Sequence, residues 1–537
     1  MFAAPLISTV LALSVLSAPS PGAEPEPEPT TPATGDPVTG DPLTEAATEA
    51  LAEVRDLLDD TTTSLLPPVA EPQADLTLEL RDLAMLKDEL PPALREEAEA
   101  YLARPTDGKK DQYGDGYTTD DVFTECSEAV CVHYVTTTAD RVPVADADEN
   151  GVPDYVDFAL ATVTEVHNRY VAAGYRPPRG DGTRGGNAKP DIYLADVGAK
   201  ALYGYCSTDE DFPGTGPQDA PAYCVLDNDY ARSQFPTNSA RDNLRVTAAH
   251  EYFHAVQFGY DASEDAWIME ATATWAEDEL YDDIDDNVQY LEYGPMAHPR
   301  KSMDQFSGLF QYGTWSFFRH VTERFPAAQG GMPTLVRDLW RRLDDARGAP
   351  DDYSLQGLKR VLNKRGTSLR DEFARYAAAN RMPGRSYEEG KANRYPAAPL
   401  GARASLAPGK LTAKPRTFRL DHLSASTIRY TPGKKLRAKN WRLRVSLVMP
   451  KRWKGSAAVV TVLPRQGAPR RTVVKLKKNG KKAQRFQFSS RSVKYVEVTL
   501  VNASDHLRCD RGTRFSCRGA PRFDGAKATV RARALRA

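Results

Sequence analysis

The spacing of apolar residues changes near residue 399, and this change limits the possible folds more than any other feature. Between about 106 and 398, apolar residues recur mainly at helical spacing, with one clear strand-like segment, DIYLAD at 191–196. From 399 onward they alternate or form β-branched runs, as in WRLRVSLVMP and VKYVEVTLVN. We therefore predict the α+β class: a body at 106–398 with a helix-rich second half, then a β-sandwich-like domain at 399–537.

Several segments of the body are expected to form helices because their apolar residues follow helical spacing. They are 156–175, 244–259, 267–281, 308–325, 334–346 and 369–381. In the C-terminal domain, Asn479-Gly480 stands between two alternating runs, and this dipeptide favours a tight hairpin between them.

Three segments precede the body. Residues 6–18 are an apolar run of signal-peptide length, too short to span a bilayer, so we assign 1–23 to a signal peptide. Residues 24–43 are rich in Pro, Thr, Glu and Gly, a composition typical of a disordered linker. Residues 44–105 are expected to be helical, with a break between two helices at Pro91 and Pro92. This helical segment is either a propeptide or an N-terminal subdomain.

The cysteines fall into three close pairs, which is typical of disulfides formed in an oxidising compartment. Nearest-neighbour pairing joins Cys126 to Cys131, Cys206 to Cys224, and Cys509 to Cys517. No cysteine precedes residue 126, which excludes a cysteine-switch prosegment. Together with the signal peptide, this pattern predicts a secreted, extracellular protein without a transmembrane segment.

The formal net charge of −3 conceals a strong division along the chain. Residues 401–537 contain 35 Lys and Arg against 5 Asp and Glu, whereas residues 1–400 contain 35 and 68. A strongly basic domain attracts polyanions, so an anionic cell-wall polymer or polysaccharide is the predicted partner, with cell-wall association as a consequence. The alternative is that the basic domain docks on the acidic part of the same chain or simply keeps it soluble.

The segment His250-Glu251-Tyr252-Phe253-His254 places two imidazoles four residues apart, which brings them to one face of a helix. The neighbouring residues carry no charge, as expected of a helix that crosses a core. A catalytic zinc ion takes three protein ligands and leaves one position open. We therefore predict that His250 and His254 bind zinc.

Glu270 is the preferred third zinc ligand, because it lies in the next predicted helix, sixteen residues after His254. Glu277 is the alternative ligand, although its reach from two turns further along would be strained. Glu264 and Asp265 lie between the two helices and are expected to be exposed in a polar turn.

Zinc in such a site activates water, and Glu251, which neighbours a ligand without being one, is the expected general base. Tyr312 is a candidate hydrogen-bond donor to the oxyanion, with a buried structural aromatic as the alternative role. Thr274, one turn after Glu270, is a candidate for supporting a zinc ligand.

These motifs resemble those of gluzincin-type zinc metallopeptidases. More closely, HEYFHAVQFGYD, WIMEATATWAEDELYDD and QYGTWSFFRHVTERFP are similar to a family of secreted bacterial metalloproteases, over roughly residues 106–345. The resemblance implies a zincin-like catalytic domain with His250, His254 and Glu270 as ligands and Glu251 as base. The chain departs from many gluzincins at Thr274, where they have an acidic residue that orients a histidine, and in a shorter gap before Glu270.

Residues 146–157, DADENGVPDYVD, match an EF-type calcium loop. The expected ligands are Asp146, Asp148, Asn150, the Val152 carbonyl, Asp154 and Asp157. Asp157 replaces the usual bidentate glutamate, which predicts weaker calcium binding. The alternative is an Asp-rich turn that caps the following helix.

Taken together, these features predict a secreted zinc-dependent metalloendopeptidase that hydrolyses protein or peptide substrates. Two alternatives stay open: a catalytically inactive surface or polyanion-binding protein whose metal braces the fold, and a zinc hydrolase of non-peptide amides. The intact Glu251 favours catalysis, because a structural metal site needs no base.

Overall fold

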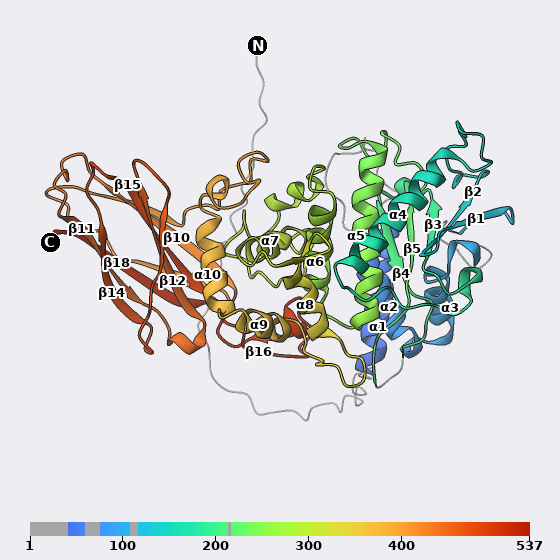
Figure 1. Cartoon of the computed structure of the whole chain (residues 1–537). Coiled ribbons are helices and arrows are strands. Elements are labelled where there is room, and N and C mark those ends of the chain that lie inside the picture. Colours follow the sequence, from blue (N-terminus) through green and yellow to red (C-terminus); the bar gives the residue numbers. More distant parts are fainter. Residues whose placement is uncertain (1–40, 60–75, 108–115, 213–215) are drawn as a thin grey trace, which may run out of the picture. The chain divides into compact units, whose positions relative to one another are not determined.

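The computed structural model describes residues 41–59, 76–107, 116–212 and 216–537 (Figure 1). The predicted signal peptide and nearly all of the predicted linker lie outside these residues. Among the described residues, no helix combines the length and the apolar character needed to cross a bilayer.

A five-stranded sheet, with strand order β1-β2-β3-β5-β4, organises the first half of the described chain. Its strands are β1 (Val122–Cys126), β2 (Cys131–Val135), β3 (Asp191–Ala195), β4 (Gly204–Ser207) and β5 (Tyr223–Asp227). β2, β3 and β5 are parallel, and β1 and β4 pair antiparallel at the two edges. The sequence predicted only β3. Three of the other strands are short and buried throughout, so they lack the alternation that would reveal them.

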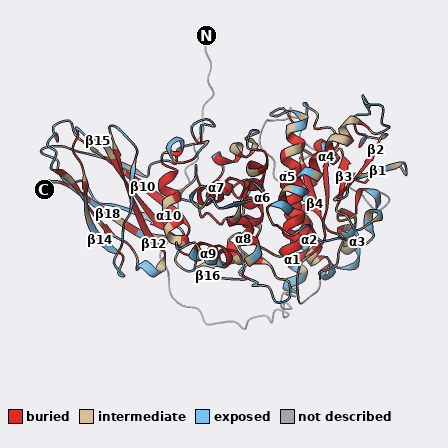
Figure 2. Cartoon of the chain, viewed as in Figure 1, coloured by how far each residue is buried: buried red, intermediate tan, exposed pale blue. Residues whose placement is uncertain are grey.

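Helices cover both faces of this sheet (Figure 2). On one face, Ile192 and Leu194 pack with α4 (Asp154–Ala172) and α5 (Ala240–Asp261). On the other face, Tyr193 and Ala195 pack with α1 (Pro42–Asp59), α2 (Thr77–Leu86) and α3 (Pro92–Tyr101). The N-terminal helices thus bury an apolar face of the sheet, and the predicted break is confirmed, because α3 begins at Pro92.

The second half of the body is helical, as predicted. α6 (Ala266–Leu280) follows α5, and α7 (Trp315–Arg324), α8 (Thr334–Leu343), α9 (Leu355–Lys364) and α10 (Leu369–Ala379) complete it. The predicted end of α5 at Gly259 is wrong, because the helix continues to Asp261. At Gly259 the helix passes the backbone of Arg179, whose N atom would lie at the ordinary contact distance of 3.4 Å from a Cβ at this position.

The three predicted cysteine pairs all lie at disulfide distance. Cys126–Cys131 joins β1 to β2, and Cys206–Cys224 joins the edge strand β4 to β5. Cys509–Cys517 closes a short loop in the C-terminal region. Nearest-neighbour pairing is therefore confirmed.

The C-terminal region contains two sheets that share one apolar core. One sheet has the order β13-β12-β15-β10-β8: β13 (Arg470–Val473), β12 (Ser456–Pro464), β15 (Val493–Asn502), β10 (Ser424–Pro432), β8 (Ala402–Leu406). The other has the order β14-β11-β18-β9: β14 (Lys481–Gln487), β11 (Trp441–Val448), β18 (Ala526–Arg536), β9 (Arg416–Leu420). The five-stranded sheet packs one face against α10. The four-stranded sheet lies on the opposite face of the five-stranded sheet (Figure 1).

The predicted hairpin at Asn479-Gly480 is wrong. The turn itself is present, with the Gly480 N–H donating to the Lys477 carbonyl at 2.9 Å. However, β13 pairs with β12 while β14 pairs with β11, so the chain passes from one sheet to the other at this turn. Gly480 is required there because a Cβ would lie 2.0 Å from the Pro450 carbonyl oxygen. A turn signal between two strands does not show that they pair.

Candidate metal centre

The predicted zinc ligands converge on one point between α5 and α6. His254 Nε2 lies 3.1 Å from His250 Nε2, and Glu270 Oε2 lies 3.3 Å and 3.7 Å from the nitrogens of His250 and His254. Zinc–nitrogen bonds of about 2.0–2.1 Å in a tetrahedral site place ligand atoms about 3.3 Å apart. The donor atoms and their spacing therefore fit a zinc ion held by three protein ligands.

The second nitrogen of each histidine is held by a buried neighbour. His250 Nδ1 lies 2.5 Å from Glu277 Oε1, and His254 Nδ1 lies 2.7 Å from Gln257 Oε1. The Gln257 amide in turn donates to the Met269 carbonyl on α6 at 3.0 Å. Such contacts fix the ring orientation and direct both Nε2 atoms toward the metal position.

Glu277, considered from the sequence as an alternative ligand, has a different place in the structure. It lies seven residues after Glu270, which returns it to the same face of α6, and it contacts the outer nitrogen of His250. Burial raises the pKa of Glu277 to about 7, and the hydrogen bond with His250 opposes this rise. A carboxylate that orients a histidine is thus present, although not at Thr274, where the family pattern has it.

Thr274 and Tyr312 both lie close to the site but differ in what they contact. The Thr274 hydroxyl donates to the Glu270 carbonyl at 2.9 Å, so it supports the helix backbone at the ligand. The Tyr312 ring lies 6.2 Å from the His250 ring and stacks on Tyr290, and it is buried. Tyr312 starts a 3₁₀ turn, Tyr312–Thr314, that precedes α7, so the predicted continuous helix over 308–325 is wrong.

The turn between α5 and α6 is buried, which contradicts the expected exposure of Glu264 and Asp265. Two distant segments cover it. Arg81 of α2 donates to the carbonyls of Ala262 and Glu264, at 2.8 Å and 2.9 Å. The backbone N–H of Cys517, in the C-terminal region, donates to Asp265 at 2.8 Å. The junction of α5 and α6, the two helices that carry the predicted zinc ligands, is therefore held by residues from both ends of the chain.

The N-terminal helical segment also reaches the candidate base. The hydroxyl of Thr77, the first residue of α2, donates to Glu251 Oε2 at 3.0 Å and accepts from the Cys206 N–H of edge strand β4 at 2.9 Å. His250, Glu251, His254 and Glu270 are all buried, between 0% and 7% exposed. The sequence offered no signal for Thr77, because 174 residues separate it from Glu251.

The predicted calcium loop brings together three of its four expected carboxylate ligands. Asp146, Asp148 and Asp154 each place a carboxylate oxygen within 4.8 Å of the others. Asp157 contacts this group through Asn150, whose amide donates to Asp157 at 3.0 Å and to Asp148 at 3.3 Å. The N–H groups of Asn150 and Gly151 donate to Asp146. The carboxylates fit a hard cation, which prefers oxygen ligands.

A third carboxylate group, Asp278, Asp282 and Glu389, already surrounds a cation of the protein itself. The Arg319 guanidinium lies within 4 Å of all three carboxylates, closest to Asp278 at 2.9 Å. This group therefore has the character of an ion-pair network and not of a metal site.

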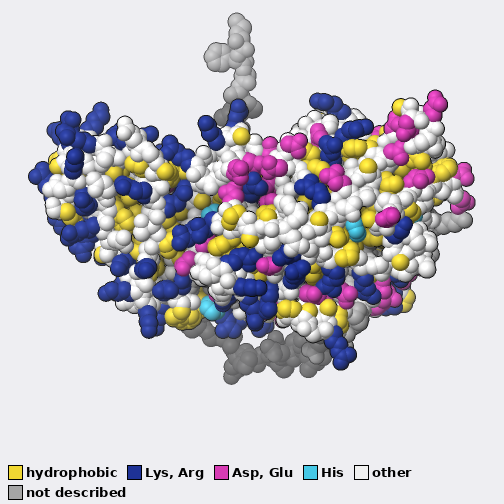
Figure 3. Space-filling model, in the orientation of Figure 1, with side chains coloured by type: hydrophobic (Ala, Val, Ile, Leu, Met, Phe, Trp, Pro, Cys, Tyr) yellow, Lys and Arg dark blue, Asp and Glu magenta, His cyan; other side chains and the backbone are white. Residues whose placement is uncertain are grey.

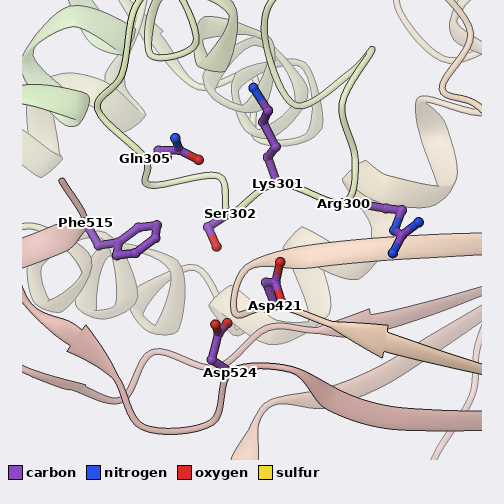
Figure 4. A pocket seen from close by; sticks show the side chains of 7 residues that line it. All are labelled: Arg300, Lys301, Ser302, Gln305, Asp421, Phe515 and Asp524. Atoms are coloured by element: carbon purple, nitrogen blue, oxygen red, sulfur yellow. The ribbon is translucent and has the colours of Figure 1, made fainter. Parts of the chain in front are cut away.

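A surface hollow lies where residues 300–305 meet the C-terminal region, and it contains none of the predicted zinc ligands. Figure 4 shows its lining residues: Arg300, Lys301, Ser302, Gln305, Asp421, Phe515 and Asp524. Two cations and two carboxylates line it, so no single charge dominates.

Neither the models of protein families nor the curated proteins searched contain a match to this chain.

Proposed function

We propose that this protein is a zinc-dependent metallopeptidase with a zincin-like catalytic part. The observation that supports this best is the convergence of two imidazole nitrogens and one carboxylate oxygen at 3.1–3.7 Å, on two packed helices. Three ligands leave the fourth position of a tetrahedral ion open, which is the arrangement of catalytic zinc.

Each residue then has a defined task. When bound, zinc supplies a Lewis acid that polarises the scissile carbonyl and acidifies water. Glu251 takes the proton from the attacking water and returns it to the leaving amine. Glu277 and Gln257 keep the two imidazoles in orientation, and Tyr312, beside His250, is the proposed donor to the oxyanion.

The test is hydrolysis of unfolded casein by the Glu251→Gln variant. We expect activity to fall at least 100-fold while the zinc content stays at that of the wild type, because the ligands are intact. Glu165→Gln, on the exposed side of α4, is the matched control and should retain full activity. Casein hydrolysis that survives in Glu251→Gln would contradict the mechanism. Zinc bound without hydrolysis of any peptide, ester or amide would favour the inactive, metal-braced alternative.

The form described here is proposed to be latent. Thr77 hydrogen-bonds to both the candidate base, Glu251, and the Cys206 N–H of edge strand β4. A substrate reaches these groups only in molecules in which α2 has moved away, so the casein hydrolysis expected of the full chain comes from this fraction. The helices α1–α3 also bury one face of the central sheet. We therefore propose that this segment is both a subdomain of the fold and an inhibitory segment that covers the candidate base.

Weakening the contact of α2 should therefore raise activity. Arg81→Ala removes the two hydrogen bonds to the α5–α6 turn, and we expect several-fold faster casein hydrolysis by the full chain. The control is Arg55→Ala, which breaks a pair with Glu97 inside the N-terminal segment. An Arg81→Ala chain that keeps its zinc and its melting temperature without any gain in activity would refute the inhibitory role.

Two further properties belong to this proposal. Calcium bound at Asp146, Asp148 and Asp154 stabilises the fold, and the three disulfides accord with export to an oxidising compartment. Secretion is tested by detecting the chain, without its first 23 or so residues, in the culture medium.

A further inference from the structure

The four-stranded sheet of the C-terminal region has two contrasting faces. Its inner face contributes Leu443, Val445, Val530 and Ala532 to the shared core. The alternate positions of the four strands form the outer face, which carries eight Lys or Arg and no Asp or Glu among its described residues. Figure 3 shows Lys and Arg gathered over this strand-rich region.

Three arginines on this face stand in one row across neighbouring strands. Arg444 of β11 lies directly opposite Arg485 of β14 and directly opposite Arg533 of β18. Nearby, Lys527 of β18 lies opposite Arg419 of β9. All five are exposed. Directly opposed side chains on paired strands have Cβ atoms about 4.5–5.5 Å apart, so this arrangement places like charges at the closest cross-strand spacing.

Nothing in the described part of the chain neutralises these charges. Among the carboxylates of the described residues, none forms an ion pair with the row or with the Lys527–Arg419 pair. In the five-stranded sheet, Arg429 contacts Glu497 at 2.7 Å, and Arg381, at the end of the body, contacts the same carboxylate at 3.1 Å. Like charges directly opposite each other destabilise a sheet, so the fold itself gains nothing from this face.

We propose that this face binds a linear phosphodiester polymer through its backbone charges. Guanidinium groups match phosphate oxygens in a bidentate geometry, and five or so neighbouring cations favour a polymer over a single ion. The face carries no aromatic side chain on which a nucleobase could stack, so recognition depends on the backbone and not on bases. A wall polymer of glycerol phosphate and a nucleic acid share this chemistry.

The experiment measures binding of the full chain to poly(glycerol phosphate), to single-stranded DNA and to poly-glutamate at several salt concentrations. We expect both phosphodiester polymers to bind and poly-glutamate to bind at least tenfold more weakly. The affinity for the phosphodiester polymers should fall steeply with salt, with a log–log slope of about −2 or steeper for three or more neutralised phosphates. Tighter binding of one phosphodiester polymer identifies the source.

The decisive variant replaces all three arginines of the row by glutamine: Arg444→Gln, Arg485→Gln and Arg533→Gln. This triple variant should bind the phosphodiester polymers at least tenfold more weakly. The matched control replaces three exposed arginines on or beside the five-stranded sheet, Arg403, Arg470 and Arg491, by Gln, and should change binding less than threefold. Equal losses in the two triple variants would overturn the proposal, because overall charge would then explain binding. Equal affinity for poly-glutamate, or no binding at 50 mM NaCl (about a 14 Å screening length), would overturn it as well.

Discussion

Two groups of side chains in this molecule could each hold a metal ion, and the protein positions them in opposite ways. His250, His254 and Glu270 are buried on packed helices, and buried side chains bind the outer nitrogen of each histidine. The carboxylates of Asp146 and Asp148 lie at least partly exposed, and their hydrogen bonds are to the backbone and amide of their own loop. The first group is held by the packing and hydrogen bonds of two helices, whereas the second is held by hydrogen bonds within one loop. We therefore expect tight, essential binding at the first site and weaker, stabilising binding at the second.

The largest effect is expected from His254→Ala. Loss of one of three ligands should reduce zinc from about one ion per chain to nearly none and abolish hydrolysis. Metal analysis of the chain purified without chelator provides the measurement. His506→Ala, an exposed histidine in the C-terminal region, is the control and should keep its zinc. Full zinc content in His254→Ala would mean that the ion is bound elsewhere.

Glu277→Gln tests whether the contact to the outer nitrogen of His250 contributes to the first site. Removing such a partner typically weakens metal affinity by about 10–100-fold. Competition with a chelator of known affinity measures this loss. Asp282→Asn, two-thirds exposed and close to the same helix, removes an equal charge and should leave zinc affinity unchanged. Equal affinity in Glu277→Gln and the wild type would show that α5 alone orients the ring.

The response of the melting temperature to added calcium should distinguish the loop site from the histidine site. Adding calcium at 100 times its dissociation constant stabilises a protein by about 2.7 kcal/mol, so the wild type should melt several degrees higher. Asp146→Asn should lose most of this shift and keep its zinc. Glu149→Gln removes a charge from a non-ligand position of the same loop and should retain most of the shift. A calcium shift that is the same in all three proteins would place the ion outside this loop.

For both candidate metal sites, the sequence predicted the residues whose arrangement depends on local spacing along the chain. The i, i+4 histidines and the Asp-rich loop each lie within one element, so periodicity and motif were enough to find them. Glu270 lies on the next helix and needed only the assumption that α5 and α6 pack. Strands β2, β4 and β5 escaped prediction because a short, fully buried strand has no alternation, although β3, which is equally buried, was predicted.

The residues that the sequence missed act across the fold. Gln257 lies three residues after His254, and its role would have been visible from helical spacing. Thr77 and Cys517 lie far along the chain from the residues they contact, and only the tertiary structure brings them there. Glu264 and Asp265 were expected to be exposed because the turn is polar. They are buried because Arg81, Ser354 and Cys517 provide their hydrogen bonds.

The smallest predicted effect concerns a buried histidine that serves as a cation and not as a ligand. His422 Nε2 lies 2.7 Å from Asp304 Oδ1, at the junction between the body and the C-terminal region. Burial lowers the pKa of His422, but the nearby carboxylates of Asp304 and Asp524 outweigh burial and raise it to about 9. Burial raises the pKa of Asp304, and His422 and Ser516 lower it below its usual range.

A histidine whose pKa rises on folding stabilises the protein fully below its unfolded pKa of about 6.5, and this contribution is lost as the pH rises through 9. The depressed pKa of Asp304 adds stability above about pH 4 that is lost in acid. We therefore expect the melting temperatures of the wild type and Asp304→Asn to differ by several degrees at pH 6 and to converge toward pH 9.5. A difference that stays constant over this range would show that Asp304 acts through its hydrogen bonds to Ser516 alone, with His422 neutral throughout.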